Sequence, residues 1–588
     1  MSLAEVITEW VGDAFAALGL DRSFGEVVVS QRAELAQFQC NGALQAARPS
    51  GKAPRELADG LVSLLADRPE LEAVSAAGPG FLNLTLTDEF LAGYCQKLVH
   101  DPRLGVPLTT PPLKVVVDYA GPNVAKAMHA GHLRATIIGD SLARLFRFAG
   151  HQVIRDPHFG DWGVQMGLTI VGIEERWPDL PYFDPRFKGP YPDTSPITLE
   201  DLQEIYPDVS ARQENDEKLA ERARQVTLDL QQGTPGYRAL WHHMKQVSEE
   251  SQRRDFATLG VEFDLWYGES DVRDRLAPMI ERLVTDGVAE RSEGALVIRI
   301  DEPGDKRELP PFILEKSDGG FLYSTTDLAT VEFRAKELGA DLVLYVVDRR
   351  QSDHLEAVFR AARRASIAPP HMRLEHIPFG TMNGPDGRPF KTRAGGVVTL
   401  GDLLALVIEA AHSRIDEAEI ARGYSTAERE QIALAVGIAA LKFGDLSNHR
   451  NSDYLFLLDR FTSFDGKTGP YLQYGAVRIK SIIRNADALG LERGPMLPAT
   501  HPAERSLLLH LSMLPEVIFR AIDTRAPNHV AEYAFELAGA WNRFYDACHI
   551  LNQPDLFRRA SWLTLAETTL AALTLLLDLL GIEVPERM

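Results

Sequence analysis

Two histidines stand close together where a predicted strand gives way to a predicted helix. Residues 122–146 read PNVAKAMHAGHLRATIIGDSLARLF and contain His129, Gly131 and His132. The β-branched run at residues 113–120 predicts a buried strand, and apolar residues recur at helical spacing after the histidines. We therefore place both histidines at a strand-to-helix turn.

Such a turn is suited to binding a polyphosphate. Beyond the strand ends of an open α/β sheet, a helix N-terminus presents unpaired N–H groups and the positive end of its dipole. Gly131 has no Cβ, so the backbone and a flat ring can approach closely there. The two histidines can donate hydrogen bonds to phosphate oxygens as charge shifts onto them. The residue types therefore favour nucleotide binding.

Two alternatives to nucleotide binding stay open on this stretch alone. Histidine is a common metal ligand, but no third ligand lies at zinc-site spacing and the chain has only three cysteines. We therefore expect no dedicated metal site. The second alternative is that both histidines pack at the start of a helix without a function.

The composition of the 588-residue chain is typical of a soluble protein with several domains, and its formal net charge is −21. This charge argues against non-specific nucleic-acid binding but allows local basic patches. Three widely spaced cysteines and an N-terminus unlike a targeting peptide lead us to expect a cytoplasmic protein. The apolar run at 570–584 contains Asp578, so we expect a buried helix and no membrane contact.

Three segments of different character follow one another. Residues 1–110 mix helical stretches with a short alternating run, which predicts an α+β domain. Residues 111–405 alternate strands and helices, which implies a parallel α/β sheet, with an insertion around 174–250. Residues 406–588 predict an all-α helical bundle. The strands predicted in the middle segment are residues 113–120, 151–156, 295–300, 341–348 and 372–380.

HAGH at residues 129–132 resembles the HIGH motif of class I aminoacyl-tRNA synthetases, and the stretch around it resembles the signature of the arginyl-tRNA synthetase family. GDWGVQMG at 160–167 and TGPYLQYGAVRI at 468–479 resemble further stretches of that family. The N-terminal segment matches more loosely, through FQCNGAL at 38–44. The resemblance implies a Rossmann-like catalytic domain between an N-terminal tRNA-contacting domain and a helical anticodon-binding domain.

The resemblance also implies a two-step ligase reaction. The carboxylate of L-arginine attacks the α-phosphate of ATP, and the terminal ribose of tRNA(Arg) then accepts the arginyl group. ATP is thus the expected substrate, with Mg²⁺ accompanying its phosphates. By the resemblance, His129 and His132 contact the phosphates and Gly131 admits the adenine. Positioning and charge stabilisation carry such a reaction, without a covalent nucleophile.

A second signature of the class, the lysine-rich KMSKS loop, is altered in this chain. The corresponding stretch reads RPFKTRAGGVV, and Thr392 stands where the second lysine belongs, flanked by Lys391 and Arg393. The resemblance points to Lys126, three residues before His129, as a substitute cation. Lys391 and Arg393 stay candidates for catalysis, and Lys391 for ATP binding. The alternative is that both form a solvated loop face.

Selection of arginine requires carboxylates and carbonyl-type acceptors, because a guanidinium is planar and carries five donors. Tyr323 and Asp327 are four residues apart and share a face if a helix begins there. We expect Asp327 to bind the guanidinium. Taken singly, Asp327 could instead be a helix N-terminal acid, and Tyr323 a core aromatic. The resemblance implies an arginine-binding set of Asp118, Asn123, Tyr323, Asp327 and Gln351.

The helical end carries aromatic and basic residues that suit single-stranded RNA. We expect Tyr471, Tyr474, Arg478 and Tyr545 to contact tRNA, and the resemblance adds Phe38 and Gln39. Packing inside the bundle is the alternative for each tyrosine. We expect a monomer. A small-molecule ATP-dependent ligase and a non-catalytic tRNA-binding relative remain the alternative functions.

Overall fold

The chain folds into two compact units. The structure is a computed structural model that describes residues 2–30, 36–305, 309–317, 320, 323–388, 398–418 and 423–588. The central unit, named for its place in the sequence, comprises Thr110–Ser413 and Ala440–Thr462. The terminal unit comprises Met1–Thr109, Arg414–Ala439 and Ser463–Met588.

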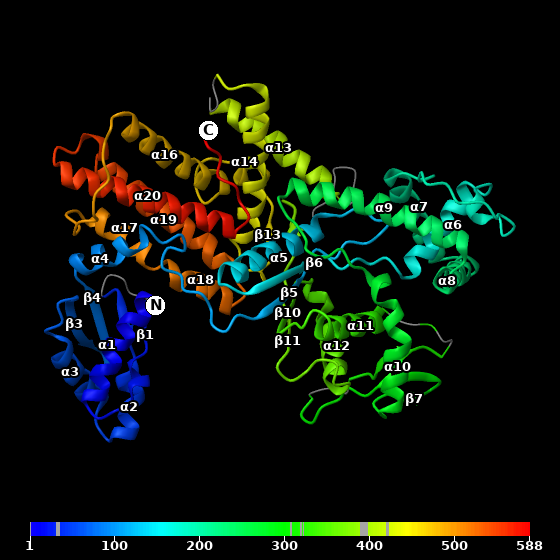
Figure 1. Cartoon of the computed structure of the whole chain (residues 1–588), viewed down its shortest axis with the longest axis horizontal. Coiled ribbons are helices and arrows are strands. Elements are labelled where there is room, and N and C mark those ends of the chain that lie inside the picture. The colour runs from blue at the N-terminus through cyan, green and yellow to red at the C-terminus, as the bar shows by residue number, and fades with distance from the viewer. Residues whose placement is uncertain are drawn as a thin grey trace. The chain divides into compact units, whose positions relative to one another are not determined.

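Four parallel strands form the sheet of the central unit in the order β11-β10-β5-β6 (Figure 1). Their bounds are β5 Lys114–Asp118, β6 Gln152–Asp156, β10 Leu342–Tyr345 and β11 Arg373–His376. The aliphatic runs of β5 and β10 are buried, as expected of parallel strands covered by helices. Four of the predicted strands are thereby confirmed. The register aligns Asp118 with Tyr345 and Asp156, so polar side chains gather at the carboxyl ends.

The strand predicted at residues 295–300 does form, as β8 (Ala295–Ile298), but it is not part of the parallel sheet. It pairs antiparallel with β7 (Glu290–Ser292) and β9 (Phe312–Glu315) in a separate three-stranded sheet. The expectation that it joins the parallel sheet was wrong, because an alternation of strands and helices does not fix which strands pair.

Helices connect the parallel strands and cover them. α5 (Ala130–Phe148) leads from β5 to β6, and α12 (Ser352–Arg364) leads from β10 to β11. Val116, Leu328, Val343 and Val358 belong to the apolar cluster packed against this sheet. Further elements are η3 Glu269–Arg275, α10 Leu276–Thr285, α11 Tyr323–Lys336, η4 Arg349–Gln351, β12 Met382–Asn383, α13 Leu400–Glu417, α14 Thr426–Leu446, β13 Tyr454–Leu455 and α15 Leu458–Phe461.

A group of helices after β6 has its own apolar core. It contains α6 (Val164–Arg176), η2 (Pro181–Phe183), α7 (Leu199–Gln213), α8 (Glu217–Gln232) and α9 (Pro235–Thr258). Residues from all four α-helices, among them Met166, Leu202, Ala223 and Leu240, are buried together. These helices lie between β6 and β10 in the sequence, which is where the sequence predicts an insertion.

The terminal unit combines an N-terminal α+β part with a C-terminal helical part, which confirms the predicted fold class. Its antiparallel sheet has the order β1-β2-β4-β3. The bounds are α1 Leu3–Ala17, η1 Arg22–Gly25, β1 Val27–Val29, β2 Phe38–Cys40, α2 Gly42–Ser50, α3 Pro54–Leu65, β3 Leu71–Ala77, β4 Phe81–Leu86, α4 Asp88–Leu98, α16 Gly469–Ala488, α17 Pro502–Ser512, α18 Leu514–Asp523, α19 Asn528–Ala547, η5 Ile550–Asn552 and α20 Leu556–Leu579.

Helix α20 is long and apolar enough to cross a membrane by length and composition. However, 67% of its most apolar stretch is buried inside the structure, as in the core helix of a bundle. This agrees with the buried helix predicted from the apolar run near the end of the chain.

Candidate functional site

His129 and His132 lie at the N-terminus of α5, as predicted, and each ring nitrogen Nδ1 accepts a backbone hydrogen bond. The Gly131 N–H donates to Nδ1 of His129 at 3.0 Å, and the His129 N–H donates to Nδ1 of His132 at 3.0 Å. A neutral imidazole that accepts at Nδ1 carries its proton on Nε2. Both rings are therefore fixed in the tautomer that offers an Nε2–H donor.

Both histidines are held in the neutral form. Burial lowers the pKa of His129, and the nearby cations Lys126 and Arg350 lower it further. Burial, assisted by His129, lowers the pKa of His132 to about 3. At neutral pH the pair thus offers hydrogen-bond donors without a full positive charge, so the charge that stabilises a phosphate must come from other residues.

A cavity of about 950 Å³ opens in front of this turn, which is large enough for a nucleotide. His129, Gly131 and Lys126 line it together with Arg350, whose guanidinium is held by Asp348 at 2.8 Å. Residues 379–382, Thr399 and one side of α7 complete the lining. The lining therefore includes the cations Lys126 and Arg350 and the carboxylates Asp348 and Glu214.

The turn before the histidines is backbone-strained. Ala125 has a φ of +62°, in the left-handed region that residues with a Cβ rarely adopt. Its N–H donates to Oγ of Ser248 on α9 at 3.0 Å, which helps to hold this conformation. Lys126 follows directly, is exposed and lines the cavity.

Lys391 and Arg393 lie outside the described residues. The chain after their loop is described, and it returns to the histidine turn. Thr399 forms a β-bridge with His129, and the Leu400 N–H donates to the Met128 carbonyl at 2.8 Å. Residues 399 and 400 are thereby bonded to the histidine turn beside the cavity.

Helix α11 begins at Tyr323, which confirms that Tyr323 and Asp327 share a helical face. Asp327 Oδ2 lies 2.6 Å from Nε2 of His354, and the rings of Tyr323 and His354 are 4.7 Å apart. Tyr323 is 58% exposed. Gln351 precedes the first residue of α12 and is exposed. The starts of α11 and α12 thus bring three of the predicted residues to one place.

Glu269 and His354 belong to this place and were missed by the sequence analysis. Burial raises the pKa of Glu269 to about 7, and the negative charges of Asp327 and Asp161 contribute. The element η3, which begins at Glu269, packs against α11, the helix that carries Asp327, and the charge of Asp327 acts on Glu269. Glu269 follows Gly268 in the stretch FDLWYGESDVR at 263–273, which carries no recognisable motif. His354 could have been found, since it lies in the first turn of the helix that Gln351 precedes.

Asp118 and Asn123, the other two residues that are predicted to bind arginine, are engaged by other side chains of the protein. Asp118 pairs at 2.7 Å with the fully buried Arg334, which also pairs with Asp156 at 2.7 Å. The negative charge of Asp118 is thus already compensated within the protein. Asn123 Oδ1 accepts from Nε2 of Gln165 at 3.2 Å.

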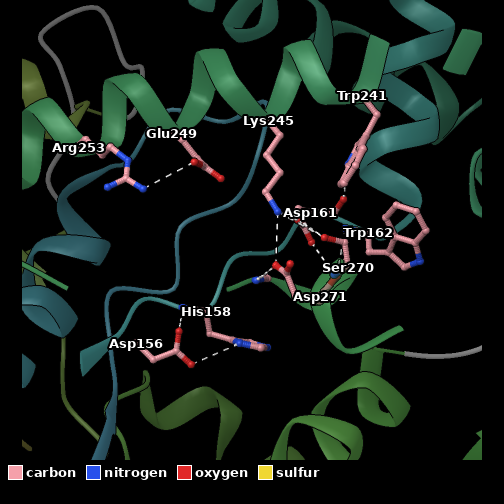
Figure 2. A network of polar contacts seen from close by, with 12 residues as sticks. Asp156, His158, Asp161, Trp162, Trp241, Lys245, Glu249, Arg253, Ser270 and Asp271 are labelled. Carbon is pink, nitrogen blue, oxygen red and sulfur yellow. Dashed lines mark hydrogen bonds and ion pairs between the residues drawn. The ribbon is translucent and has the colours of Figure 1, made fainter. Parts of the chain in front are cut away.

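Asp156 also fixes His158, which lies beside it in Figure 2. Although burial acts to lower it, the pKa of His158 is raised to about 9 by Asp156. Asp118, Arg334, Asp156 and His158 therefore form one group of paired charges.

The two residues of the N-terminal segment that are predicted to contact tRNA, Phe38 and Gln39, differ in their exposure to solvent. Phe38 is fully buried in the terminal unit and is not available for contact, so that prediction is corrected. In β2 the residues Phe38 and Cys40 point inward, whereas Gln39 is half-exposed and donates to Oδ1 of Asn83 at 3.1 Å. Only Gln39 of this pair reaches the surface.

The predicted residues of the helical part are at least partly accessible. The Arg478 guanidinium lies 5.3 Å from the centre of the half-buried Tyr545 ring, which stacks on Trp541. Tyr474 is 38% exposed, and the hydroxyl of Tyr471 accepts from Nδ2 of Asn542 at 2.7 Å. Arg478 and Tyr545 therefore form one cationic and aromatic surface.

Comparisons with known proteins agree with this geometry. The description "tRNA synthetases class I (R), catalytic domain" matches residues 95–458, which hold the parallel sheet and the histidine turn. The fold and site thus define a class I aminoacyl-tRNA synthetase. "Arginyl tRNA synthetase N terminal domain" matches residues 2–86, and "DALR anticodon binding domain" matches residues 472–588. The chain belongs to the arginyl-tRNA synthetase family.

Relatives and solved structures match over the whole chain. The chain is 48% identical to the arginine–tRNA ligase of Maricaulis maris and 43% identical to that of Alkaliphilus oremlandii, with 100% of each chain covered. The arginyl-tRNA synthetase structures from Plasmodium falciparum and Thermus thermophilus share its fold, with TM-scores of 0.81 and 0.80 at 24% and 23% identity. They cover 100% of this chain, and 98% and 100% of their own chains are matched.

Proposed function

We propose that the cavity at the start of α5 binds ATP and that the starts of α11 and α12 bind arginine, in an enzyme that activates arginine and transfers it to tRNA(Arg). The observation that carries this proposal is the neutral His129, which lines a cavity of about 950 Å³ and whose Nδ1 accepts from the Gly131 N–H, so that its Nε2–H is left as a donor. His132 is not part of the cavity lining, and its Nδ1 accepts from the His129 N–H. Donors fixed in this way act on developing phosphate charge without reorganising. Gly131 leaves room for the adenine.

We assign the amino acid to the space between Asp327 and Glu269. Two carboxylates can neutralise a guanidinium and accept several of its five N–H donors. Tyr323, Asn123 and Gln351 are the candidates for the remaining contacts. Asp118, already paired with Arg334, supports the floor of the pocket instead of supplying free negative charge.

The reaction follows from this placement. An oxygen of the arginine carboxylate attacks the α-phosphorus of ATP, the bond to the β-phosphate oxygen breaks, and pyrophosphate leaves. The terminal ribose hydroxyl of tRNA(Arg) then attacks the carbonyl carbon of the adenylate, and AMP leaves as the ester forms. Lys126 is our candidate for the cation that stabilises the first transition state, with Lys391 and Arg393 as the alternatives.

Magnesium enters with the nucleotide in this proposal. Among the described residues no group of three or more histidine, cysteine, aspartate or glutamate side chains could hold a metal ion. Two carboxylates line the cavity, Asp348, which is engaged by Arg350, and the exposed Glu214 at the end of α7. This donor set fits a Mg²⁺ ion held by phosphate oxygens and water, and the ion would neutralise phosphate charge.

The remaining parts of the proposal concern tRNA and the cell. Gln39, Tyr471, Tyr474, Arg478 and Tyr545 are the candidate tRNA contacts, since exposed aromatics stack unpaired bases and cations bind phosphates. We propose that the enzyme acts as a monomer in the cytoplasm, without membrane contact.

Charging of tRNA tests the proposal. Labelled arginine, lysine and citrulline are each supplied with ATP, Mg²⁺ and tRNA(Arg), and the ester formed is counted. We expect charging with arginine alone, because lysine lacks the planar fork and citrulline lacks the charge. Charging with lysine or citrulline at a comparable rate would contradict the assigned acid pair.

A further inference from the structure

One face of helix α9 contacts both turns that build the candidate site. Trp241, Lys245, Ser248 and Gln252 follow at spacings of four, three and four residues, which places them on the same side of the helix. Ser248 accepts from the Ala125 N–H at 3.0 Å, and Gln252 donates to the Asn123 carbonyl at 3.1 Å. These two residues hold the turn that leads to the histidines.

The other two residues of this face hold Asp161, which is fully buried. Trp241 Nε1 donates to its backbone carbonyl at 2.8 Å, and Nζ of Lys245 lies 2.8 Å from its Oδ2. Figure 2 shows the Lys245 side chain descending from α9 to meet this carboxylate. Burial acts to lower the pKa of Lys245, but Asp161 raises it above the usual value. The pair is therefore an ion pair at neutral pH.

Asp161 in turn holds the segment that carries Glu269. Its Oδ1 accepts from the Ser270 N–H at 2.9 Å and its Oδ2 accepts from the Ser270 hydroxyl at 2.7 Å. A Cβ at Gly268 would lie 2.7 Å from both of these oxygens, so the close approach requires glycine there.

A second set of contacts fixes Glu269 itself. Its N–H donates to the Phe159 carbonyl at 3.0 Å, and its Oε2 accepts from the Trp162 N–H at 3.3 Å. Glu269 is thus bonded directly to the stretch 159–162, and its neighbour Ser270 is bonded to Asp161. A shift of Asp161 would therefore move Glu269.

We propose that Lys245 is a positioning residue for arginine recognition, which holds Asp161 and, through Ser270, aims Glu269 at the space shared with Asp327. The inference rests on the proposed role of Glu269 in binding arginine. Without the ammonium group, the Asp161 carboxylate would be buried without its cation, and it would have to recruit water or move. Displacements on the order of 1 Å at a site of this kind cost about 100-fold.

Pyrophosphate exchange with the full-length enzyme and tRNA(Arg) tests this inference through Lys245→Met. We expect the arginine KM to rise about 10- to 100-fold. The ATP KM should stay within about 3-fold of the wild-type value, because Ser248 and Gln252 still hold the turn before the histidines. Lys245→Arg should restore most of the loss. Arg254→Met, which removes an exposed cation from the same helix, should leave both KM values unchanged.

Ser270→Ala is the second variant, and it decides the question if Lys245→Met does not fold. It removes one hydroxyl while both charges remain, and it should raise the arginine KM in the same direction by a smaller factor. An unchanged arginine KM in the folded variants, or equal rises of both KM values, would overturn the inference. If the wild-type enzyme shows no exchange that depends on arginine, the proposed function fails instead.

The pH profile separates positioning from general damage. The charges of Asp327 on α11 and of Asp161 and His158 on the segment after β6 act on the carboxyl of Glu269. In Lys245→Met the charge of Asp161 is no longer compensated, so Glu269 should bind its proton more tightly. The acid limb of kcat/KM for arginine should then move to higher pH, whereas general damage lowers the curve at all pH values and would contradict the proposal.

Discussion

Oδ2 of Asp327 lies 2.6 Å from Nε2 of His354, and this contact joins the N-terminal part of α11 to the first turn of α12. The ring of Tyr323 packs against the same imidazole. One oxygen of the Asp327 carboxylate is thus held by the protein, and the orientation of the carboxylate is fixed before any substrate binds. An arginine pocket of this kind gains selectivity because its acceptors are already in place.

Replacing Asp327 by asparagine should weaken the use of arginine far more than the use of ATP. A charge-assisted hydrogen bond is worth about 1.5 to 3 kcal/mol, so the arginine KM should rise by about 10- to 150-fold. Steady-state pyrophosphate exchange measures both KM values. Asp353→Asn, a neighbouring change on α12, serves as the control. Unaltered arginine kinetics in Asp327→Asn would reduce Asp327 to a structural acid.

Arginine binding should weaken as the pH falls. The pKa of Glu269 is raised to about 7 by burial and by its acidic neighbours, so the carboxyl is half-protonated near neutral pH in the free enzyme. Only its ionised form attracts a guanidinium, and binding should therefore release a proton. We expect the arginine KM to be lowest above pH 8 and to rise about 10-fold per pH unit well below 7.

Glu269→Gln provides the matched control for this pH dependence. The variant should have a higher arginine KM at pH 8 and a nearly flat profile between pH 6 and 8. The same slope in the variant as in the wild type would assign the titration to another group.

Lys126→Ala should reduce kcat for arginine activation with little change in the ATP KM, because a transition-state cation acts mainly on developing charge. Loss of one such contact costs about 10²- to 10³-fold. Single-turnover formation of the adenylate gives the rate directly. Lys391→Ala and Arg393→Ala are measured in parallel. If both of them greatly reduce the rate of adenylate formation while Lys126→Ala leaves it unchanged, the loop supplies the cation.

Tyr545→Ala should raise the KM for tRNA about 5- to 150-fold at constant salt, since stacking is worth about 1 to 3 kcal/mol per base. The ring is half-buried against Trp541 and lies beneath the Arg478 guanidinium. A thermal melt of the variant is the necessary control. A loss of affinity that only follows a lowered melting temperature would make Tyr545 a packing residue.

The local features of this chain could be predicted from the sequence, and the long-range ones could not. The strand–turn–helix around His129 is encoded in a continuous stretch whose periodicity changes at the turn. The pairing of β8 with β7 and β9 depends on tertiary contacts, which the alternation of strand and helix patterns in the sequence does not reveal. Inside β2, the period of two that buries Phe38 with Cys40 was available in the sequence and would have excluded Phe38 as a tRNA contact.

The candidate site shows the same division. Tyr323 and Asp327 are neighbours on one helix, so their relationship follows from their spacing. Glu269 is held by contacts with residues 159 and 162, and its neighbour Ser270 is held by Asp161, which pairs with Lys245 from a distant part of the chain. No local pattern encodes such a contact.

Pyrophosphate exchange with ATP and each standard amino acid in turn, with and without tRNA(Arg), tests the account most directly. We predict exchange with arginine alone, and only when tRNA(Arg) is present, because Thr392 replaces a lysine in the loop and tRNA is expected to complete the site. Exchange driven by another amino acid would contradict the arginine site, and rapid exchange with arginine in the absence of tRNA would contradict the dependence on tRNA.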